Sequence, residues 1–316
     1  MHPILMNNEL VLHHDDIGWR NSNLRWVLEP LRQHQPPIND LPILFYLLDE
    51  PEAGLQNAPI SFSWSKRIDP TTGASLTPRM RVPYVNAMTS NHVRERWRRF
   101  SAAKKKKLFH REVAWENKKD AIVWRGSTTG GMISSTTNWT KYVRFRLVDQ
   151  FGRGGVHKLS SNMNVDVDVA FSGICQCRGD CPTMMRPYRF AKRKPFNWNA
   201  HHKYIIDVDG NSFTERFPKL LQTHSLVFKI TTYVEWFSDR VFPWRDYIPV
   251  NYSTFDMHEK VGWALDHEDE AREIATRETS KRMLRREDMQ CYVYRLMLEY
   301  AELFDHTASK KNTRMS

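Results

Sequence analysis

The sequence predicts an α/β fold, because short apolar segments typical of buried strands alternate with segments of helical character. The chain has 316 residues, which is enough for two domains of ordinary size, each with its own core. Hydrophobic residues make up 41% and aromatic residues 12% of the chain. This composition fits a globular protein and argues against general disorder.

The first hundred residues contain two predicted strands. The run 42–48 is apolar and is closed by an Asp-Glu-Pro sequence, so it predicts a buried strand that ends in a loop. Residues 58–64 alternate between apolar and polar side chains and predict a second strand. Residues 66–83 are rich in Pro, Thr and Gly and predict a loop, and residues 86–107 have helical character with dense positive charge.

The middle of the chain continues the alternation. Residues 121–124 predict a strand, residues 139–151 a helix, and residues 165–171 another strand. Residues 172–200 form a basic connection that carries three of the four cysteines. It is longer than most connections in a compact domain, which favours a functional segment or an insertion.

The last third of the chain has the densest pattern. Its predicted elements are a strand-turn-helix unit over 203–221, a strand over 225–230, a helix and its exit over 236–244, a short strand over 247–250, and helices over 258–275 and 287–304. The polar tail 306–316 is expected to be disordered.

Two polar turns follow apolar strands in the same way, and they carry the clearest chemical signal. After the strand that begins at Tyr204, the turn reads Asp-Val-Asp-Gly-Asn-Ser-Phe-Thr-Glu-Arg and ends at Arg216. Gly210 lets the backbone approach a ligand closely, and backbone N–H groups at a helix start beside Arg216 suit a phosphate or diphosphate. The second turn spans residues 125–131. Two such turns predict a nucleotide-linked donor held between loops.

The chain is basic, with a net charge of +11. This charge suits an anionic partner such as a nucleotide sugar, a nucleic acid or an acidic membrane surface. Basic residues cluster at 94–99 and 104–107, and a solvated helix face is the favoured interpretation. Zinc-finger spacing, an RNA-binding aromatic signature and a basic-zipper repeat are all missing from the sequence. No nucleic-acid partner is therefore predicted.

The cysteines predict a local disulfide. Cys175, Cys177 and Cys181 form a C-x-C-x3-C cluster, whereas Cys291 stands alone. A zinc site would need a second close pair, so a disulfide within the cluster is favoured over a metal, and it implies an oxidising compartment. Glycosylation acceptor sequences begin at Asn138 and Asn251 and agree with that compartment.

The sequence contains no targeting signal that we recognise. The sequence has no apolar run of about 18 residues, which is the length that predicts a membrane span. The first residues also lack the basic and apolar regions of a signal peptide. A cytosolic protein and a chain that lacks its native N-terminus both stay open at this point. The cysteine cluster and the acceptor sequences favour the second interpretation.

Four blocks, taken in this order and spacing, resemble glycosyltransferase family 90, the group that contains the fungal capsule-associated proteins and the animal protein O-glucosyltransferases. The blocks are residues 124–131, 203–217, 225–229 with 235–237, and 244–250. The segment around Cys291 and 298–304 looks like the last helix of the family, and the resemblance covers residues 40 to 304. The sequence Asp-Val-Asp-Gly-Asn-Ser is most similar to that of the fungal branch of the family.

The resemblance implies a GT-B type glycosyltransferase with two facing Rossmann-like domains, of which the N-terminal one is shortened here. The expected parts are an acceptor-side domain over 1–117 completed by a C-terminal helix at 285–305, a donor-binding domain over 118–284, and the disordered tail 306–316.

Family members transfer a hexose or xylose from a UDP-sugar with inversion and without a metal, in the ER or Golgi lumen. The expected partners are therefore a UDP-sugar donor and a glycan or protein acceptor, and no cofactor is expected. The resemblance allows membrane association only through a missing N-terminal anchor. Glucose and xylose both stay open as the donor sugar, with xylose slightly favoured.

The catalytic residues implied by the resemblance are one base and two arginines. An inverting transfer needs a base that takes the proton of the acceptor hydroxyl. Asp49 matches the family's base, and the neighbouring Glu50 is the alternative base. Asp49 could instead have a structural role, as the residue that caps a turn. Arg144 aligns with an arginine on the diphosphate, with Arg146 as the other possible register. Arg216 matches the second arginine.

Further donor-binding positions follow from the two turns. Glu235 corresponds to a residue that holds ribose hydroxyls, and a plain surface glutamate is the alternative. The positions expected to touch donor sugar or phosphate are Gly126, Ser127, Asn211, Ser212, Phe213 and Thr214.

Two other functions are consistent with the residues. Asp207-Val-Asp209 and Asp166-Val-Asp168 have the Asp-x-Asp form that holds a metal and a diphosphate in other glycosyltransferases. A truncated, inactive transferase that binds polyanions or glycans is the second alternative. The acceptor-side loop also departs from the animal enzymes, since Arg79 falls where they carry an acidic residue, which leaves the acceptor open.

Overall fold

A computed structural model of the chain describes two long stretches and several short ones. The described residues are 113–151, 165–278, 288 and 291–302, together with 4–6, 9–11, 41–42, 44–46, 61–63, 66–69, 72 and 81–83. The predicted helix at 86–107, the tail 306–316, Arg79, Asp49 and Glu50 lie outside the described residues.

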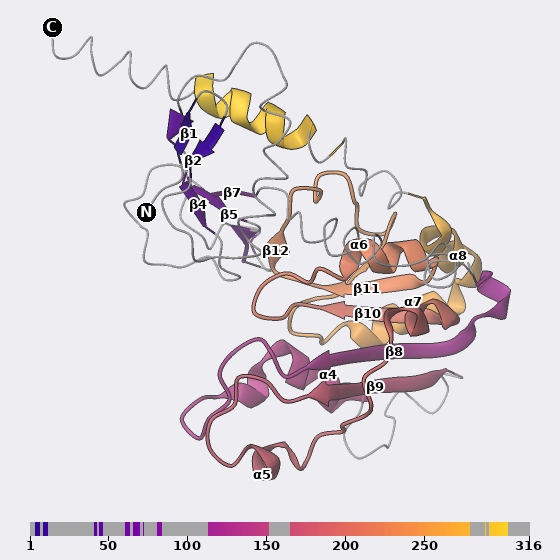
Figure 1. Cartoon of the computed structure of the whole chain (residues 1–316). Coiled ribbons are helices and arrows are strands. Elements are labelled where there is room, and N and C mark those ends of the chain that lie inside the picture. Colours follow the sequence, from indigo (N-terminus) through magenta and orange to yellow (C-terminus); the bar gives the residue numbers. More distant parts are fainter. Residues whose placement is uncertain are drawn as a thin grey trace, which may run out of the picture.

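A parallel sheet of five strands forms the centre of the long stretches (Figure 1). Its spatial order is β13-β11-β10-β8-β9, and every neighbouring pair is parallel. Such an order, with a reversal of winding inside the sheet, is typical of doubly wound α/β folds. The strands are β8 (Lys119–Ser127), β9 (Asp166–Gly173), β10 (His202–Val208), β11 (Leu226–Ile230) and β13 (Ile248–Pro249). The α/β prediction is confirmed.

The apolar composition of the central strands explains their place in the sheet. All residues of β10 and of β11 are buried, as expected for parallel strands with both faces covered. Ile205 and Ile206 point to opposite faces of β10 because side chains alternate along a strand. Each face of the sheet therefore has its own apolar layer.

The helices occur in the chain segments between and after the strands, and they pack on the sheet. α4 packs on β9 and α8 packs on β11. Phe145 of α4 contacts Phe171 of β9, with their ring centroids 4.9 Å apart. The helices are α4 (Val143–Phe151), α5 (Cys181–Met185), α6 (Phe217–Leu220), α7 (Met257–Asp266) and α8 (Glu268–Thr276), with 3-10 turns η2 (Trp115–Asn117), η3 (Trp139–Lys141), η5 (Phe196–His201) and η6 (Leu221–Thr223).

Three small sheets involve the N-terminal part of the chain. The predicted strands at 42–48 and 58–64 correspond to β4 and β5, which pair in parallel. The sheets are β2-β1-β3, β4-β5-β7 and β12-β6. Their strands are β1 (Ile4–Met6), β2 (Glu9–Val11), β3 (Leu41–Pro42), β4 (Leu44–Tyr46), β5 (Ser61–Ser63), β6 (Lys66–Arg67), β7 (Arg81–Pro83) and β12 (Tyr233–Val234). Residues 1–117, for which the sequence predicts a second Rossmann-like half, lie largely outside the described residues.

The predicted helix at 236–244 is wrong, because this segment forms a series of turns. Pro243 has no backbone N–H to donate within a helix. The carboxylate of Asp246 instead accepts a hydrogen bond from the backbone N–H of Phe242 at 2.8 Å. Trp236 and Phe237 are both buried. Two consecutive side chains on a helix would face different directions, so a turn accommodates the burial of both more easily.

Other predictions need smaller corrections. The predicted helix at 258–275 is broken at His267 into α7 and α8. β8 extends through Ser127, so the turn predicted from residue 125 starts later. The connection 172–200 is ordered by α5 and η5. The last predicted helix is confirmed over residues 291–302.

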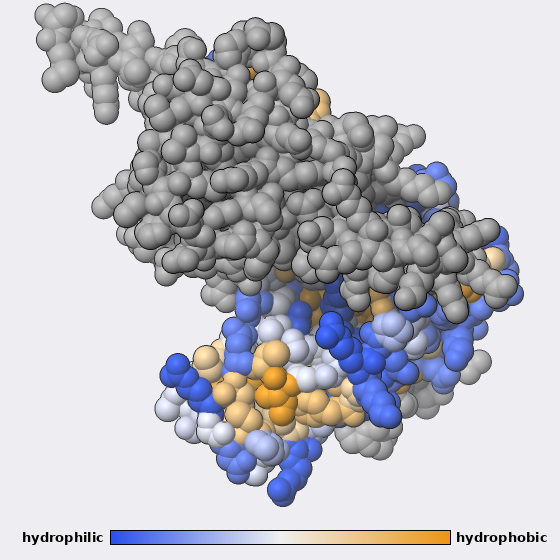
Figure 2. Space-filling model, viewed as in Figure 1, coloured by the Kyte–Doolittle hydropathy of each residue, from blue (hydrophilic) through white to orange (hydrophobic). Residues whose placement is uncertain are grey.

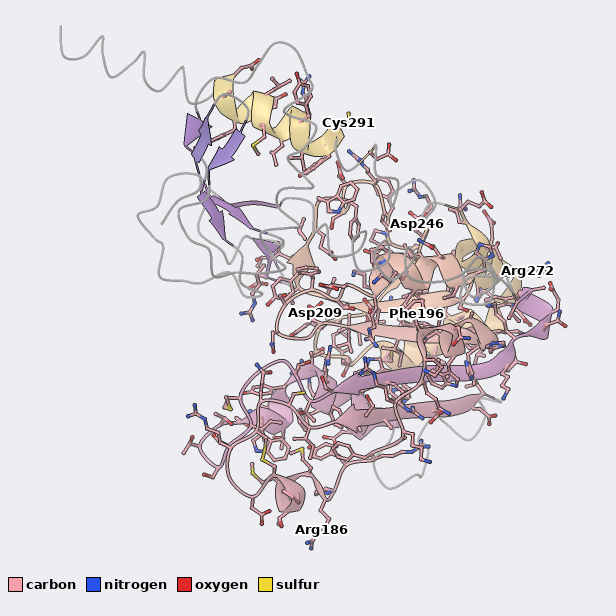
Figure 3. All side chains as sticks on the ribbon, viewed as in Figure 1. Arg186, Phe196, Asp209, Asp246, Arg272 and Cys291 are labelled. Carbon is pink, nitrogen blue, oxygen red and sulfur yellow. A yellow bond between two sulfur atoms is a disulfide. The ribbon has the colours of Figure 1, made fainter. Side chains whose placement is uncertain are left out.

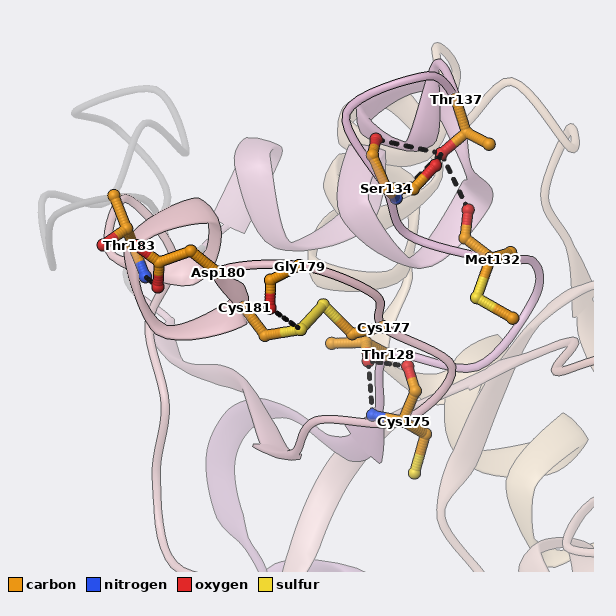
Figure 4. Close-up of a disulfide and its surroundings, with 10 residues drawn as sticks. All are labelled: Thr128, Met132, Ser134, Thr137, Cys175, Cys177, Gly179, Asp180, Cys181 and Thr183. Atoms are coloured by element: carbon orange, nitrogen blue, oxygen red, sulfur yellow. Dashed lines mark hydrogen bonds between the residues drawn. A yellow bond between two sulfur atoms is a disulfide. The ribbon is translucent and has the colours of Figure 1, made fainter.

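The predicted local disulfide is present between Cys177 and Cys181 (Figure 4). Cys175 and Cys291 are exposed free cysteines. The loop that carries the disulfide is hydrogen-bonded to Ile133, whose N–H donates to the carbonyl of Gln176 at 2.7 Å and whose carbonyl accepts from the N–H of Arg178 at 2.8 Å. The disulfide loop therefore braces the segment that follows β8.

The visible face of the described part carries both polar and apolar residues. Figure 2 shows blue, hydrophilic residues around a smaller orange, apolar area on the visible face. In the part of the chain that the structure describes, no helix combines the length and the apolar character needed to cross a membrane.

Candidate functional site

The strand order distinguishes one point along the edge of the sheet at which the strands end. β8 has β9 on one side and β10 on the other, so the direction of winding reverses between β8 and β10. In open parallel sheets, ligands bind at this reversal, outside the carboxyl ends of the strands. The turn after β8 and the turn after β10 border this point, and Figure 3 shows Asp209 at that edge of the sheet. The structure therefore brings together the two turns that the sequence singles out.

Hydrogen bonds join the two turns. The N–H of Gly130 donates to Oδ1 of Asn211 at 3.0 Å, and the hydroxyl of Tyr233 donates to the carbonyl of Asn211 at 3.1 Å. Asn211 is thus fixed from both sides by the protein. Its predicted contact with the donor stays a prediction.

Glycines allow the close approach of these segments. Gly130 has φ +119°, and a Cβ there would lie 3.3 Å from the carbonyl oxygen of Gly210. A Cβ on Gly126 would lie 2.4 Å from the ring of Trp124. Side chains at these positions would separate the two turns or displace the end of β8.

Arg144 lies beneath both turns and is buried. Its Nε donates to the carbonyl of Asp209 at 2.7 Å, and its NH1 donates to the carbonyl of Ser127 at 2.9 Å and to Oγ1 of Thr129 at 2.6 Å. Burial, together with the charge of Arg216, lowers the pKa of Arg144 to about 10. Most of its donors are occupied by the protein, so its direct contact with a diphosphate stays a prediction.

Arg146 points elsewhere. Its NH2 donates to the carbonyl of Tyr252 at 2.7 Å, and its NH1 donates to the carbonyl of Lys141 at 2.7 Å. Of the two arginines that the sequence left open, Arg144 is the one that reaches the turns.

Arg216 precedes α6 and is about one-third exposed, with 33% of its side chain accessible. Its NH1 donates to the carbonyl of Arg125 at 2.8 Å. Its NH2 has no hydrogen-bond partner among the described residues. This NH2 atom is buried and lies 3.7 Å from Oδ1 of Asp207, so the exposed third of the side chain belongs to its other atoms.

The start of α6 itself contributes less than the sequence suggests. α6 has only 4 residues, too short for a helix dipole of useful size. The backbone N–H of Arg216 already donates to Oγ1 of Thr214 at 3.1 Å. The predicted contribution of backbone N–H groups at this helix start is therefore small, and the predicted contact of the Arg216 guanidinium with a diphosphate stays a prediction.

The side chains between Asn211 and Arg216 are mostly buried. Ser212, Phe213 and Thr214 all lie in the interior. The hydroxyl of Thr214 donates to Oδ1 of Asp207 at 3.0 Å. These residues hold the shape of the turn, and their predicted donor contacts stay predictions.

Two buried carboxyl groups lie close to the site. Burial raises the pKa of Asp209 to about 7, although Lys229 opposes the shift. Burial also raises the pKa of Glu235 to about 8, again against Lys229. A protonated Glu235 can both donate and accept hydrogen bonds. Its expected role toward ribose hydroxyls stays a prediction.

Sequence reasoning missed a charge pair in the core of the site. Asp207 and Lys229 are direct neighbours across β10 and β11, and Nζ of Lys229 lies 3.7 Å from Oδ2 of Asp207. Lys229 also lies 3.6 Å from the ring centroid of Phe217. Asp207 and Lys229 are each a charged residue near the end of a mostly apolar strand. This shared position in the sequence is the signal from which the pair could have been predicted.

The chain matches a known family over nearly its whole length. A sequence profile described as Glycosyl transferase family 90 matches residues 13–315. Protein O-glucosyltransferase 2 of Danio rerio is 39% identical over 105 residues, which are 32% of this chain and 21% of that protein.

Two further relatives show the same partial similarity. Protein O-glucosyltransferase 3 of Rattus norvegicus is 36% identical over 104 residues, covering 32% of this chain and 20% of that protein. The O-glucosyltransferase rumi homolog of Aedes aegypti is 29% identical over 120 residues, covering 36% of this chain and 30% of that protein. The similarity therefore spans less than a third of the length of these relatives. The profile match shows that the chain belongs to glycosyltransferase family 90.

Proposed function

We propose that the protein transfers a sugar, xylose or glucose, from a UDP-sugar to a hydroxyl group of a glycan or protein acceptor, with inversion at the anomeric carbon. The observation that carries this proposal is the meeting of the two polar turns at the switch point of the sheet, with the partly exposed side chain of Arg216 beside them. The names of the similar proteins, all O-glucosyltransferases, agree with this activity.

In this mechanism the acceptor oxygen forms a bond to the anomeric carbon as the bond to the diphosphate oxygen breaks. The leaving UDP gains negative charge, which a fixed guanidinium stabilises more strongly as the charge develops. Arg216 takes this role, and Arg144 supports it from beneath by holding both turns in place. The overall positive charge of the chain attracts the anionic donor.

Asp49 is the proposed base that takes the proton of the acceptor hydroxyl. It lies outside the described residues, but it follows the carboxyl end of β4 by three positions, and β4 is part of a parallel sheet with β5 and β7. Carboxyl ends of parallel strands are the usual location of ligand sites in such folds. Glu50 is the alternative base.

We propose that catalysis does not depend on a metal held by Asp207 and Asp209. Both side chains are fully buried. Oδ1 of Asp207 accepts from Thr214, and Oδ2 of Asp209 accepts from the backbone N–H of Thr232 at 2.8 Å. The complete burial of both carboxylates supports a mechanism in which Arg216 rather than a metal faces the diphosphate.

Sugar transfer in this family implies that the protein works in the secretory pathway, which we propose for this chain as well. The disulfide between Cys177 and Cys181 supports an oxidising compartment. The acceptor, a glycan or a protein, is proposed only as a class.

The test is a donor-hydrolysis screen of the purified chain with UDP-glucose, UDP-xylose, UDP-galactose and UDP-glucuronate, each with and without a chelator. We expect UDP release from one of the first two donors and the same rate with the chelator. The Asp49→Asn variant is expected to lose turnover while it still binds UDP. Absence of UDP binding and of turnover with every donor would contradict the proposed function. Loss of activity with the chelator would favour the metal-dependent alternative.

A further inference from the structure

We propose that Asn138 carries an N-linked glycan when the chain passes through the secretory pathway. This modification rests on the proposed function only for the compartment. The sequence contains two acceptor sequences of the form Asn-x-Ser/Thr, at residues 138–140 and 251–253. The sugar transfer proposed above gives neither of them a role, and the structure places them in different surroundings.

The first acceptor sequence lies on the outside of the turn η3. Asn138 and Thr140 are both exposed, whereas Trp139 between them is half-buried. The ring of Trp139 packs on Phe145 and Tyr188, with centroid distances of 5.0 and 5.8 Å. Trp139 thus anchors the turn to the core, while the two residues that the modification needs stay on the surface.

The side chain of Asn138 is not needed to hold this turn together. Asn138 is the N-cap residue of η3, but its side chain makes no capping hydrogen bond. The turn is held by the backbone instead, since the N–H of Lys141 donates to the carbonyl of Asn138 at 3.1 Å. The hydroxyl of Thr140 donates to Oδ1 of Asn138 at 3.4 Å, which leaves Nδ2 as the atom that can carry a glycan into the solvent.

The loop before Asn138 is fixed by hydrogen bonds (Figure 4). The hydroxyl of Thr137 donates to the carbonyl of Met132 at 2.8 Å and accepts from the N–H of Ser134 at 3.0 Å. Ile133 in the same loop is bonded to the disulfide loop. The exposure of Asn138 is therefore a property of an ordered segment.

The second acceptor sequence is wound into a tighter turn. Asn251 is half-buried, and its Oδ1 accepts from the N–H and the hydroxyl of Ser253 at 2.8 and 2.7 Å. Its backbone N–H donates to Oδ1 of Asp256 at 3.0 Å. A glycan is bulky and hydrophilic, so the folded chain accommodates it best at an exposed position. Asn138 meets this condition better than Asn251.

The modification is a group transfer onto Nδ2 of Asn138. A bond forms between Nδ2 and the anomeric carbon of an oligosaccharide as the bond from that carbon to the phosphate of a lipid diphosphate breaks. The lipid diphosphate leaves with the electron pair of the broken bond, and Nδ2 loses one proton. The cell supplies the lipid-linked oligosaccharide and the transferring enzyme, and this chain supplies the asparagine and the threonine.

Expression of the full chain behind a cleavable secretory leader in eukaryotic cells tests the site. Release of glycans by peptide N-glycosidase in heavy-oxygen water converts each modified asparagine to an aspartate that carries the heavy isotope, which peptide mass spectrometry locates. We expect this mark at Asn138, together with a gel mobility shift that the glycosidase removes. Protein from which the leader has been cleaved is analysed from both the medium and the cells, so retention of the chain does not prevent a result.

Four variants identify the acceptor. Asn138→Gln and Thr140→Ala are each expected to abolish the mobility shift. Thr140→Ser keeps a hydroxyl group and should retain the shift. Asn251→Gln is the matched control and should leave the shift unchanged. Thermal unfolding of each variant checks that it is folded.

An unmarked Asn138 in leader-processed protein would overturn the proposal. A mobility shift that Asn251→Gln removes and Asn138→Gln leaves intact would overturn it as well. A glycan on the leader-directed chain, with none on the same chain in its own cells, would support the site and contradict the proposed compartment. Hydrolysis of UDP-sugars is measured separately, so a failure of the proposed sugar transfer is a distinct result.

Discussion

The backbone N–H of Gly130 donates to Oδ1 of Asn211 across 3.0 Å, although 81 positions separate the two residues in the chain. This bond closes the gap between the turn after β8 and the turn after β10. The same asparagine is held through its carbonyl by the hydroxyl of Tyr233. The two halves of the candidate donor site are therefore connected before any ligand binds.

Substitution Asn211→Ala is expected to weaken UDP binding by roughly 5-fold, because loss of one part-buried hydrogen bond costs about 1 kcal/mol and lets the turns separate. Calorimetric titration with UDP measures the effect. Asn199→Ala is the control, since Asn199 makes a comparable hydrogen bond to the carbonyl of Phe196 but precedes the amino end of β10. Equal UDP affinity of Asn211→Ala and the unsubstituted chain would contradict the bridging role.

Substitution Gly131→Ala is expected to destabilise the fold by about 1–3 kcal/mol. Gly131 has φ +146°, and a Cβ there would lie 2.5 Å from the ring of Tyr142. Gly173→Ala is a matched control, because a Cβ at that position would meet no neighbouring atom within 4 Å. Thermal or urea unfolding of both variants gives the comparison, and similar midpoints for the two would show that the Tyr142 contact is harmless.

The free energy of unfolding is expected to fall as the pH rises from about 5 to 8. The pKa of Glu235 is raised by burial to about 8, from 4.5 for an unperturbed glutamate. The folded state therefore binds more protons than the unfolded state in this window, and stability decreases with pH by up to about 1.4 kcal/mol per unit for this one group. The stabilising effect is complete below the unfolded pKa and is lost as the pH passes the folded pKa. Asp209, whose pKa is raised to about 7, acts in the same direction.

Urea unfolding of Glu235→Gln between pH 5 and 8 measures this contribution. The variant should show a flatter dependence of stability on pH than the unsubstituted chain. Glu273→Gln, at an exposed ion pair with Arg277, controls for the removal of one carboxylate. Parallel curves for Glu235→Gln and the unsubstituted chain would show that Glu235 does not bind the extra proton.

Reduction of the disulfide is expected to lower the free energy of unfolding by on the order of 2 kcal/mol, given the short loop that Cys177 and Cys181 close. Because this loop is bonded to Ile133 on the segment after β8, UDP affinity should fall as well. Unfolding and UDP titration with and without a reductant measure both effects. The double variant Cys177→Ser, Cys181→Ser should resemble the reduced protein and not respond to the reductant, whereas Cys175→Ser should respond as the unsubstituted chain does.

The sheet could be predicted from the sequence, because its strands are apolar runs with clear ends. The pattern also identified both turns of the candidate site, since polar residues and glycines follow the strands directly. Their meeting at the switch point required the strand order, which no local pattern contains. The prediction at 236–244 failed because buried aromatic residues there resemble a helix, while Pro243 and Asp246 stabilise turns instead.

The side-chain directions of the charged residues were not predictable from the sequence. Arg144 and Arg146 are two positions apart on one helix, yet one reaches the turns and the other the carbonyl of Tyr252. The pairing of Asp207 with Lys229 depends on the register of two strands. Both features arise from tertiary packing, and a sequence pattern gives only the residues that take part.

The antiparallel pairing of β12 with β6 has a consequence for dissecting the protein. The N–H of Ile68 donates to the carbonyl of Thr232 at 2.7 Å, and the N–H of Thr232 in turn donates to Asp209. A shortened protein that starts at residue 113 would expose the hydrogen-bonding edge of β12 to other molecules, and such bare edges promote self-association. Residues 66–68 thus cover the backbone edge of β12, and we expect their removal to promote self-association.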